Sequence, residues 1–256
     1  MRTTLWLDTS RPAADLLSMA AAAESAGWDG LRVDDTPDSQ ECWALAGALA
    51  SAVPRVRIEV VVDPAQGRHP AVVAKLASTV DQLSGGRLLL GFLPERTSVG
   101  DARLAEAVQV VKRLAPGQPA TWRGQFYRLQ DAPLDPPTVQ HPFPVMLVGG
   151  TAAQAAAWAD AWTLFGPPAS VADHIGDLVA ACAAVGRDPA TIALSVFVDE
   201  PSSLGSARSA SVPATADDRA ASDARGPGVV EVVIGDAALG ADPAQWPTAL
   251  ARLRQP

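Results

Sequence analysis

Acidic side chains follow several of the short apolar runs in the first hundred residues. Asp8, Asp34, Asp35, Asp63 and Glu95 each come at or just after such a run. Carboxylates that lie close together raise one another's pKa for acid and base chemistry, or bind a divalent cation, and they repel an anionic cofactor. Asp is equally common in solvated turns, so that interpretation stays open. Asp35 and Asp63 are the catalytic candidates among them.

Histidine and cysteine add little to this set. His69 precedes a proline, where its side chain either contacts a ligand or caps the helix that the proline begins. His141 and His174 are scattered, and neither a Gly-x-Ser-x-Gly motif nor a supported Cys–His pair occurs. The two cysteines, Cys42 and Cys182, lie in apolar helical patterns typical of buried side chains. We therefore predict no metal centre.

Hydrophobic periodicity divides the chain into alternating strands and helices. After Pro70, the residues Val73, Leu76 and Val80 recur every three or four positions, which predicts a helix that ends at Gly85. The next run, RLLLGF, is apolar without alternation, as in strands covered by helices on both faces of a parallel sheet. Further strands are predicted at 2–7, 28–33, 56–62, 145–148, 161–165, 191–198 and 228–235.

Eight strands alternating with helices over 256 residues predict a (β/α)8 TIM barrel, an α/β fold, as one domain spanning 1–256. A doubly wound open sheet fits less well, because no glycine-rich phosphate turn follows the first strand. Residues 117–143 interrupt the rhythm with a predicted hairpin, ATWRGQFYRL, inserted before the fifth strand. Residues 202–228 hold few large apolar side chains, and we predict that this segment is mobile or disordered.

Charge and hydropathy exclude some classes of partner. The net charge of -8 argues against nonspecific nucleic-acid binding, which needs a basic surface. No apolar run approaches the roughly 20 residues of a membrane span, and the start MRTTLWLDTS lacks the apolar core of a signal peptide. We expect a cytoplasmic protein with a small-molecule substrate and no membrane or nucleic-acid partner.

Three blocks of sequence carry a family resemblance. HPAVVAKLASTVDQLSGGRLLLGF, WRGQFYRLQDAPLDPPTVQHPFPVMLVGG and WADAW together resemble the bacterial luciferase-like monooxygenases. The resemblance implies a (β/α)8 barrel that binds FMN or a deazaflavin (coenzyme F420) and acts as an oxidoreductase or monooxygenase on a small organic substrate. It also implies a dimer, either of two copies or with a related barrel.

The resemblance further implies a cofactor site. Gly149, Gly150 and Thr151 correspond to the turn that holds the cofactor phosphate, and a helix start offers unpaired N–H groups for such an anion. Val62 and Asp63 correspond to the strand end beside the flavin ring. Trp6, on the first strand, is a candidate for the pocket wall.

The chain departs from the family in two places. After the second strand, Asp35 and Thr36 replace the usual Asp-His pair, so the active-site histidine is absent. After the fourth strand, a few residues replace a longer glycine-rich loop. Two alternatives follow. One is a degenerate, non-redox barrel that has lost its cofactor and acts as a binding or partner protein. The other is a cofactor-free or metal-assisted enzyme that uses the acidic barrel mouth.

Overall fold

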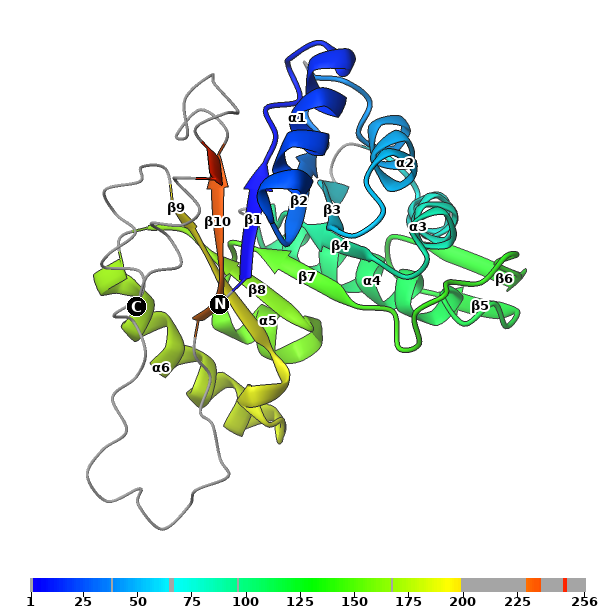
Figure 1. Cartoon of the computed structure of the whole chain (residues 1–256). Coiled ribbons are helices and arrows are strands. Elements are labelled where there is room, and N and C mark those ends of the chain that lie inside the picture. Colours follow the sequence, from blue (N-terminus) through cyan, green and yellow to red (C-terminus); the bar gives the residue numbers. More distant parts are fainter. Residues whose placement is uncertain are drawn as a thin grey trace.

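The predicted barrel is confirmed in the computed structural model. The structure describes residues 2–37, 39–64, 67–95, 97–166, 168–198, 229–235 and 246–247. Eight parallel strands close into a barrel, and the last strand pairs back with the first. In order around the barrel, the strands are β1 (Arg2–Trp6), β2 (Gly30–Asp34), β3 (Arg57–Val62), β4 (Leu88–Phe92), β7 (Val145–Val148), β8 (Ala161–Leu164), β9 (Ala193–Val198) and β10 (Val229–Gly235) (Figure 1).

Helices connect most of these strands and cover the outside of the barrel. They are α1 (Ala13–Ala26), α2 (Cys42–Ala52), α3 (Pro70–Ser84), α4 (Ser98–Leu114), α5 (Ala152–Trp158) and α6 (Pro168–Val185). Helix α4 begins at Ser98. The Thr97 side chain caps this start by accepting a hydrogen bond from the Gly100 N–H at 3.0 Å.

The Ser-Gly-Gly-Arg turn between α3 and β4 holds three elements together. Gly85 has φ 65° and ends α3 in the left-handed conformation, which suits glycine. Arg87 then donates hydrogen bonds to the carbonyl oxygens of Ser84 at 2.7 Å and Ala50 at 3.0 Å, and also to that of Val56. One side chain therefore links the ends of α2 and α3 to the start of β3.

The predicted hairpin is also present, as β5 (Ala120–Arg123) and β6 (Arg128–Ala132). Glu106 on α4 anchors it by accepting hydrogen bonds from Trp122 Nε1 at 2.8 Å and from the N–H groups of Phe126 and Tyr127 at 3.0 and 2.9 Å. Burial alone would raise the pKa of Glu106, but these hydrogen bonds hold it below its usual value.

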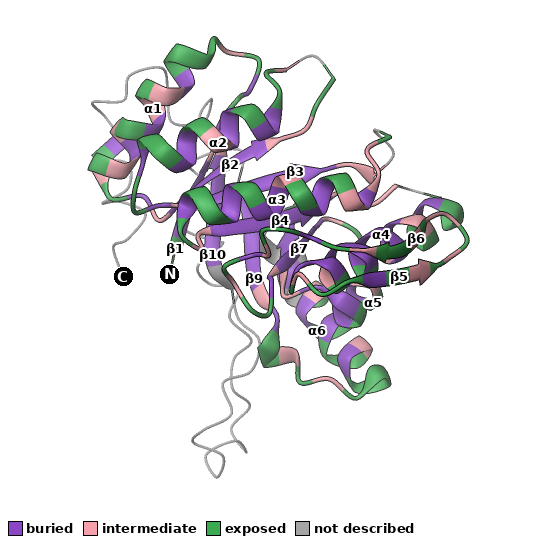
Figure 2. Ribbon diagram, turned by 90° about the vertical axis from the view of Figure 1, so that its right-hand side faces the viewer, coloured by how far each residue is buried: buried purple, intermediate pink, exposed green. Residues whose placement is uncertain are grey.

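Apolar side chains fill the layer between strands and helices, while the barrel interior is partly polar. Figure 2 shows the buried strands and the buried inner faces of the helices. Inside the barrel, a small apolar cluster is formed by Val61, Leu89, Met146 and Val148. The rest of the interior includes a network of four charged side chains, namely Arg32, Glu59, Arg57 and Glu231.

Some predictions fall outside the described residues. The segment 202–228, predicted to be mobile or disordered, lies there entirely. Within the described ranges, no helix has the length and hydrophobicity needed to cross a membrane.

Candidate functional site

A pocket of about 460 Å³ opens where the chain leaves β4, β7 and β8, at the carboxyl end of the barrel. Barrel enzymes build their active sites from the loops at this end. The pocket contains the predicted glycine turn and the shortened segment after β4. Its lining residues are Leu93, Pro94, Glu95, Asp101, Val148, Gly149, Gly150, Thr151, Gln154 and Phe165.

The turn from β7 into α5 places its glycines against this pocket. Gly149 and Gly150 both have left-handed backbones, with φ 73° and 76°. A Cβ atom on Gly150 would lie 2.6 Å from Gln154 Oε1 and 3.2 Å from Pro94 Cγ. Glycine is therefore required at Gly150 by both the backbone angle and the neighbouring side chains.

Two N–H groups of this turn, those of Gly149 and Thr151, already have acceptors within the chain. The Gly149 N–H binds the carbonyl oxygen of Thr163 at 2.8 Å. Thr151 and Gln154 form a capping box: the Thr151 N–H binds Gln154 Oε1 at 2.9 Å, and the Gln154 N–H binds Thr151 Oγ1 at 3.3 Å. The turn thus satisfies these N–H groups within the chain itself.

Among the described residues that line the pocket, the charged ones are two carboxylates, Glu95 and Asp101. Asp101 Oδ1 accepts a hydrogen bond from Gln154 Nε2 at 2.7 Å. Glu95 Oε1 pairs with Arg103 Nη1 at 3.1 Å, and the Arg103 guanidinium also lies over the Phe126 ring.

For the phosphate of FMN or of a deazaflavin cofactor, this turn has groups that favour binding and groups that oppose it. The N–H groups of Gly150, Ala152 and Ala153 have no acceptor among the described residues, whereas the N–H groups of Gly149 and Thr151 are used within the chain and the two lining carboxylates repel an anion. By contrast, the apolar side chains of Leu93, Val148 and Phe165 suit an uncharged ring system.

Aromatic side chains line up across this end of the barrel. The rings of Phe165 and Phe197 are 5.5 Å apart, and those of Phe197 and Trp6 are 5.0 Å apart in an edge-to-face arrangement. Phe165, at one end of this row, is 47% exposed. An exposed aromatic face beside a pocket is a typical surface for ligand contact.

The other predicted site residues do not line this pocket. Val62 is buried, and its carbonyl oxygen accepts a hydrogen bond from the Leu93 N–H at 2.9 Å, while Asp63 follows it at the end of β3. His69 caps α3, since its Nδ1 accepts a hydrogen bond from the Ala71 N–H at 3.2 Å. Its ring packs edge to face on Tyr127, 5.3 Å away.

The acidic residues at the strand ends are divided among separate contacts. Asp35 forms an ion pair with Arg68. Asp8 accepts two hydrogen bonds from Ser10, which lower the pKa of its carboxyl. In the part of the chain that the structure describes, no group of three or more His, Cys, Asp or Glu side chains is placed to hold a metal ion.

Asp34 is the carboxylate that sequence reasoning passed over in favour of its neighbour. Arg32 points into the barrel, where its Nε lies 2.8 Å from Glu59 Oε2, and strand alternation puts Asp34 on the same face. Its Oδ1 is buried without a hydrogen-bond partner among the described residues. Burial raises the pKa of Asp34 to about 6, opposed by Arg32 and aided by Glu59. The alternation of inward-facing and outward-facing residues along β2 was the signal in the sequence that could have identified Asp34.

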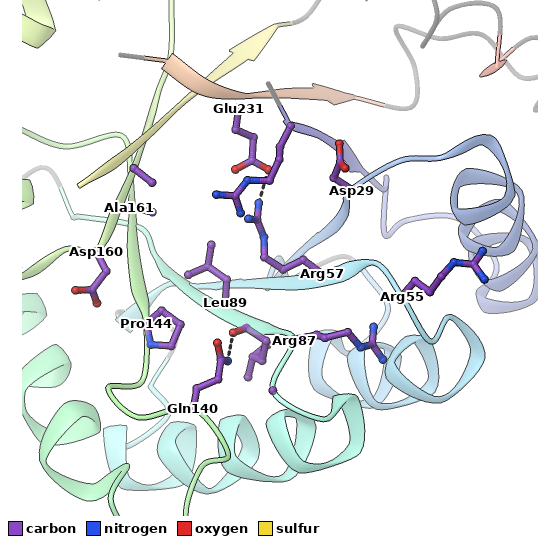
Figure 3. A pocket seen from close by; sticks show the side chains of 14 residues that line it. Asp29, Arg55, Arg57, Arg87, Leu89, Gln140, Pro144, Asp160, Ala161 and Glu231 are labelled. Carbon is purple, nitrogen blue, oxygen red and sulfur yellow. Dashed lines mark hydrogen bonds and ion pairs between the residues drawn. The ribbon is translucent and has the colours of Figure 1, made fainter. Parts of the chain in front are cut away.

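A second cavity, of about 410 Å³, lies at the amino end of the barrel (Figure 3). Arginine side chains from several elements line it, namely Arg2, Arg55, Arg57 and Arg87. Arg57 pairs with both Glu59 and Glu231. Burial and the charge of Glu59 raise the pKa of Glu231. These ion pairs therefore connect β3 with β10 near the amino end of the barrel.

Comparison with known proteins supports the same fold. The tetrahydromethanopterin reductase of Methanopyrus kandleri, which depends on coenzyme F420, aligns with a TM-score of 0.78 at 14% identity over 98% of this chain and 97% of its own. An F420-dependent secondary alcohol dehydrogenase aligns with a TM-score of 0.70 at 21% identity, over 80% and 72% of the two chains. A monooxygenase from Streptomyces bottropensis gives 0.68 at 21% identity, over 78% and 71%.

Sequence comparison assigns the family. The family model described as luciferase-like monooxygenase matches residues 1–203, which is most of the chain and includes the pocket at the carboxyl end of the barrel. The protein therefore belongs to the luciferase-like monooxygenase family.

Proposed function

We propose that this protein is an oxidoreductase of the luciferase-like type that acts on a small organic molecule at the carboxyl end of its barrel. The observation that carries the proposal is the pocket beside the Gly149–Thr151 turn. It combines an apolar wall with a few fixed polar groups, which is the usual composition of a small-molecule site. Its volume of about 460 Å³ lies within the range of ligand pockets.

The apolar side chains of the pocket form a surface on which a planar ligand can pack. Phe165 presents a partly exposed ring, and Val148 and Leu93 extend the apolar surface beside it. On the opposite side, Gln154 is held by Thr151 and Asp101, so its amide is fixed before a ligand arrives. Fixed polar groups orient a ligand at a low entropic cost.

Family membership supports a flavin or deazaflavin ring as the ligand that supplies redox chemistry. Two of the structural relatives are F420-dependent by name. The proposal for this chain covers the ring system.

Titration of the full chain with riboflavin, FMN and a deazaflavin tests this proposal. Binding should change the absorbance of the ring and raise the thermal unfolding temperature, because a ligand of the native state stabilises that state. Phe165→Ala should weaken binding about tenfold through loss of ring stacking. Leu83→Ala, which truncates an apolar side chain of similar exposure on α3, should leave affinity unchanged. Equal affinities of both variants and the natural chain would contradict the proposed site.

A second candidate function is a binding protein without redox chemistry. The specific observation in its favour is that Asp35 forms an ion pair with Arg68 at the place where the family has its Asp-His pair. Failure of all three ring compounds to bind, with the native fold intact by circular dichroism, would favour this candidate over the oxidoreductase.

A further inference from the structure

We infer that Asp34 belongs to the ligand site at the carboxyl end of the barrel and takes up a proton from solvent when a ligand binds there. This inference rests on the proposed function and adds a residue to its site. The direction of the Asp34 side chain, the apolar side chains on both sides of it and the pairing of the interior charges carry it.

The register of β2 places the Asp34 side chain at the inner face of the barrel. Arg32 on the same strand reaches the interior, where its Nη2 donates a hydrogen bond to Thr163 Oγ1 at 3.0 Å. Side chains two positions apart on a strand share a face, so Asp34 faces the interior closer to the carboxyl end. Its Oδ1 is buried and has no hydrogen-bond partner among the described residues, which is rare for a polar atom in a native structure.

Val61 connects Asp34 with the pocket described above. It lies opposite Asp34 in the register of β2 and β3. A Cβ atom on Gly91 would lie 3.0 Å from Val61 Cγ2 and 3.4 Å from Val148 Cγ2, so these two valines approach each other over the glycine. Since Val148 lines the pocket, Asp34 borders the same apolar surface.

Aromatic rings connect the other side of Asp34 with the pocket. Trp6 on β1 lies opposite Arg32 in the register of β1 and β2. Its ring packs on Phe197, which in turn packs on Phe165 of the pocket lining. Asp34 is therefore a carboxyl group bordered by apolar side chains on both neighbouring strands.

The charged side chains described in the barrel interior pair with one another and not with Asp34. Arg32 Nη2 lies 2.7 Å from Glu59 Oε2, and Arg57 pairs with both Glu59 and Glu231. Two cations thus balance two anions, and an ionised Asp34 would add a charge without a partner. Burial and the charge of Glu59 accordingly raise the pKa of Asp34 to about 6, although Arg32 opposes them.

The other described titratable groups around Asp34 are acidic or already paired. Asp8 and Asp63 follow the neighbouring strands β1 and β3. Asp35, the next residue along the chain, forms an ion pair with Arg68. None of these groups supplies Asp34 with a cation.

A ligand ring on this apolar surface would remove water from Asp34, which is only partly buried as a whole residue. Loss of water disfavours the ionised form of a carboxyl group and so raises its pKa further. Above pH 6, binding is then accompanied by uptake of one proton onto the carboxylate. The neutral carboxyl group offers an O–H donor to an acceptor atom of the ligand.

Riboflavin binding between pH 5.5 and pH 7.5 tests the inference, because the flavin ring itself carries no charge in this range. The natural chain should bind riboflavin about tenfold more tightly at pH 5.5 than at pH 7.5, since the bound form holds the proton. Calorimetry at pH 7 in two buffers of different ionisation enthalpy should show uptake of roughly half a proton or more per ligand. This series requires no variant.

Asp34→Asn keeps the size of the side chain and the neutral charge of the protonated acid. Its riboflavin affinity at pH 7.5 should match that of the natural chain at pH 5.5 within about threefold, without pH dependence or proton uptake. Asp15→Asn makes the same substitution at an exposed carboxyl group on α1 and should retain both effects.

The outcomes separate the inference from the proposed function. Riboflavin affinity that does not change with pH in the natural chain, or that increases as the pH rises, would overturn the inference and leave the oxidoreductase proposal standing. The same pH dependence and proton uptake in Asp34→Asn as in the natural chain would also overturn it. Absence of riboflavin binding at every pH would instead contradict the proposed function, and the inference would fall with it.

Discussion

At the scale of single residues, Asp34 is a carboxyl group whose buried environment strongly alters its chemistry. Its buried oxygen has no hydrogen-bond partner among the described residues, and burial raises its pKa to about 6. In the unfolded chain, this carboxyl group releases its proton near the ordinary Asp pKa of 3.8. Between these two values the folded state binds more protons than the unfolded state, so stability falls as the pH rises through that window.

The pH dependence of unfolding tests this assignment. We predict that Asp34 lowers the free energy of unfolding by about 1 kcal/mol between pH 5 and pH 7, out of about 3 kcal/mol in total at neutral pH. The variant Asp34→Asn should lose this fall in the free energy of unfolding between pH 5 and pH 7, and the control variant Asp15→Asn should retain it. Urea unfolding across this pH range provides the measurement, and parallel curves for the natural chain and Asp34→Asn would show that Asp34 is not responsible.

The glycine turn and its neighbours show which parts of the site can be predicted from the sequence and which cannot. Gly149 to Thr151 were predicted by family resemblance, and the structure places them in a pocket. Their role in binding a cofactor phosphate stays a prediction, and the lining carboxylates argue against it. The contact of Asp101 with Gln154 joins residues 53 positions apart, which periodicity and motifs do not reveal.

At the scale of elements, the hairpin depends on one carboxylate of α4. Glu106 accepts hydrogen bonds from the Trp122 ring and from the N–H groups of Phe126 and Tyr127. Glutamine offers only one acceptor oxygen at this place, so one of these donors would face an NH₂ group. The hairpin position was readable from the sequence, but its anchor was not, because the contact joins separate elements.

We predict that Glu106→Gln lowers the free energy of unfolding by about 1–3 kcal/mol, the usual cost of an unsatisfied buried donor. Amide hydrogen exchange at Phe126 and Tyr127 should become faster, whereas exchange on β3 should change only as far as global stability does. Asp131→Asn removes an exposed charge from the same hairpin and serves as the control. Equal exchange in both variants would show that Glu106 does not anchor the hairpin.

At the scale of the whole molecule, the two ends of the barrel differ in charge. Among the described residues, four arginines and three carboxylates line the cavity at the amino end, whereas the charged residues that line the pocket at the carboxyl end are two carboxylates. Between the two ends, Glu59 is completely buried and binds Arg32 and Arg57. Burial would raise the pKa of Glu59, but these two guanidiniums lower it below its usual value.

The barrel itself was predictable because its signals are local. Unbroken apolar runs such as RLLLGF, and helices ended by glycines such as Gly85, repeat along the chain and determine the order of strands. The interior ion pairs were not predicted, because they join residues of separate strands. Arg32 and Glu59 face each other on the paired strands β2 and β3, and Glu231 lies on β10, which pairs with β1 to close the barrel. Local pattern therefore predicted the scaffold, and long-range contacts determine the charge of its two ends.

The most direct test of where this barrel binds its ligand is hydrogen exchange of the full chain with and without saturating riboflavin. Binding at the carboxyl end predicts slower exchange at residues 93–101 and 148–154, which contain the glycine turn and both carboxylates. Residues 55–57 and 86–89, at the arginine-lined end, should be unaffected. Protection confined to that opposite end, or protection at neither end, would contradict a functional site at the carboxyl mouth.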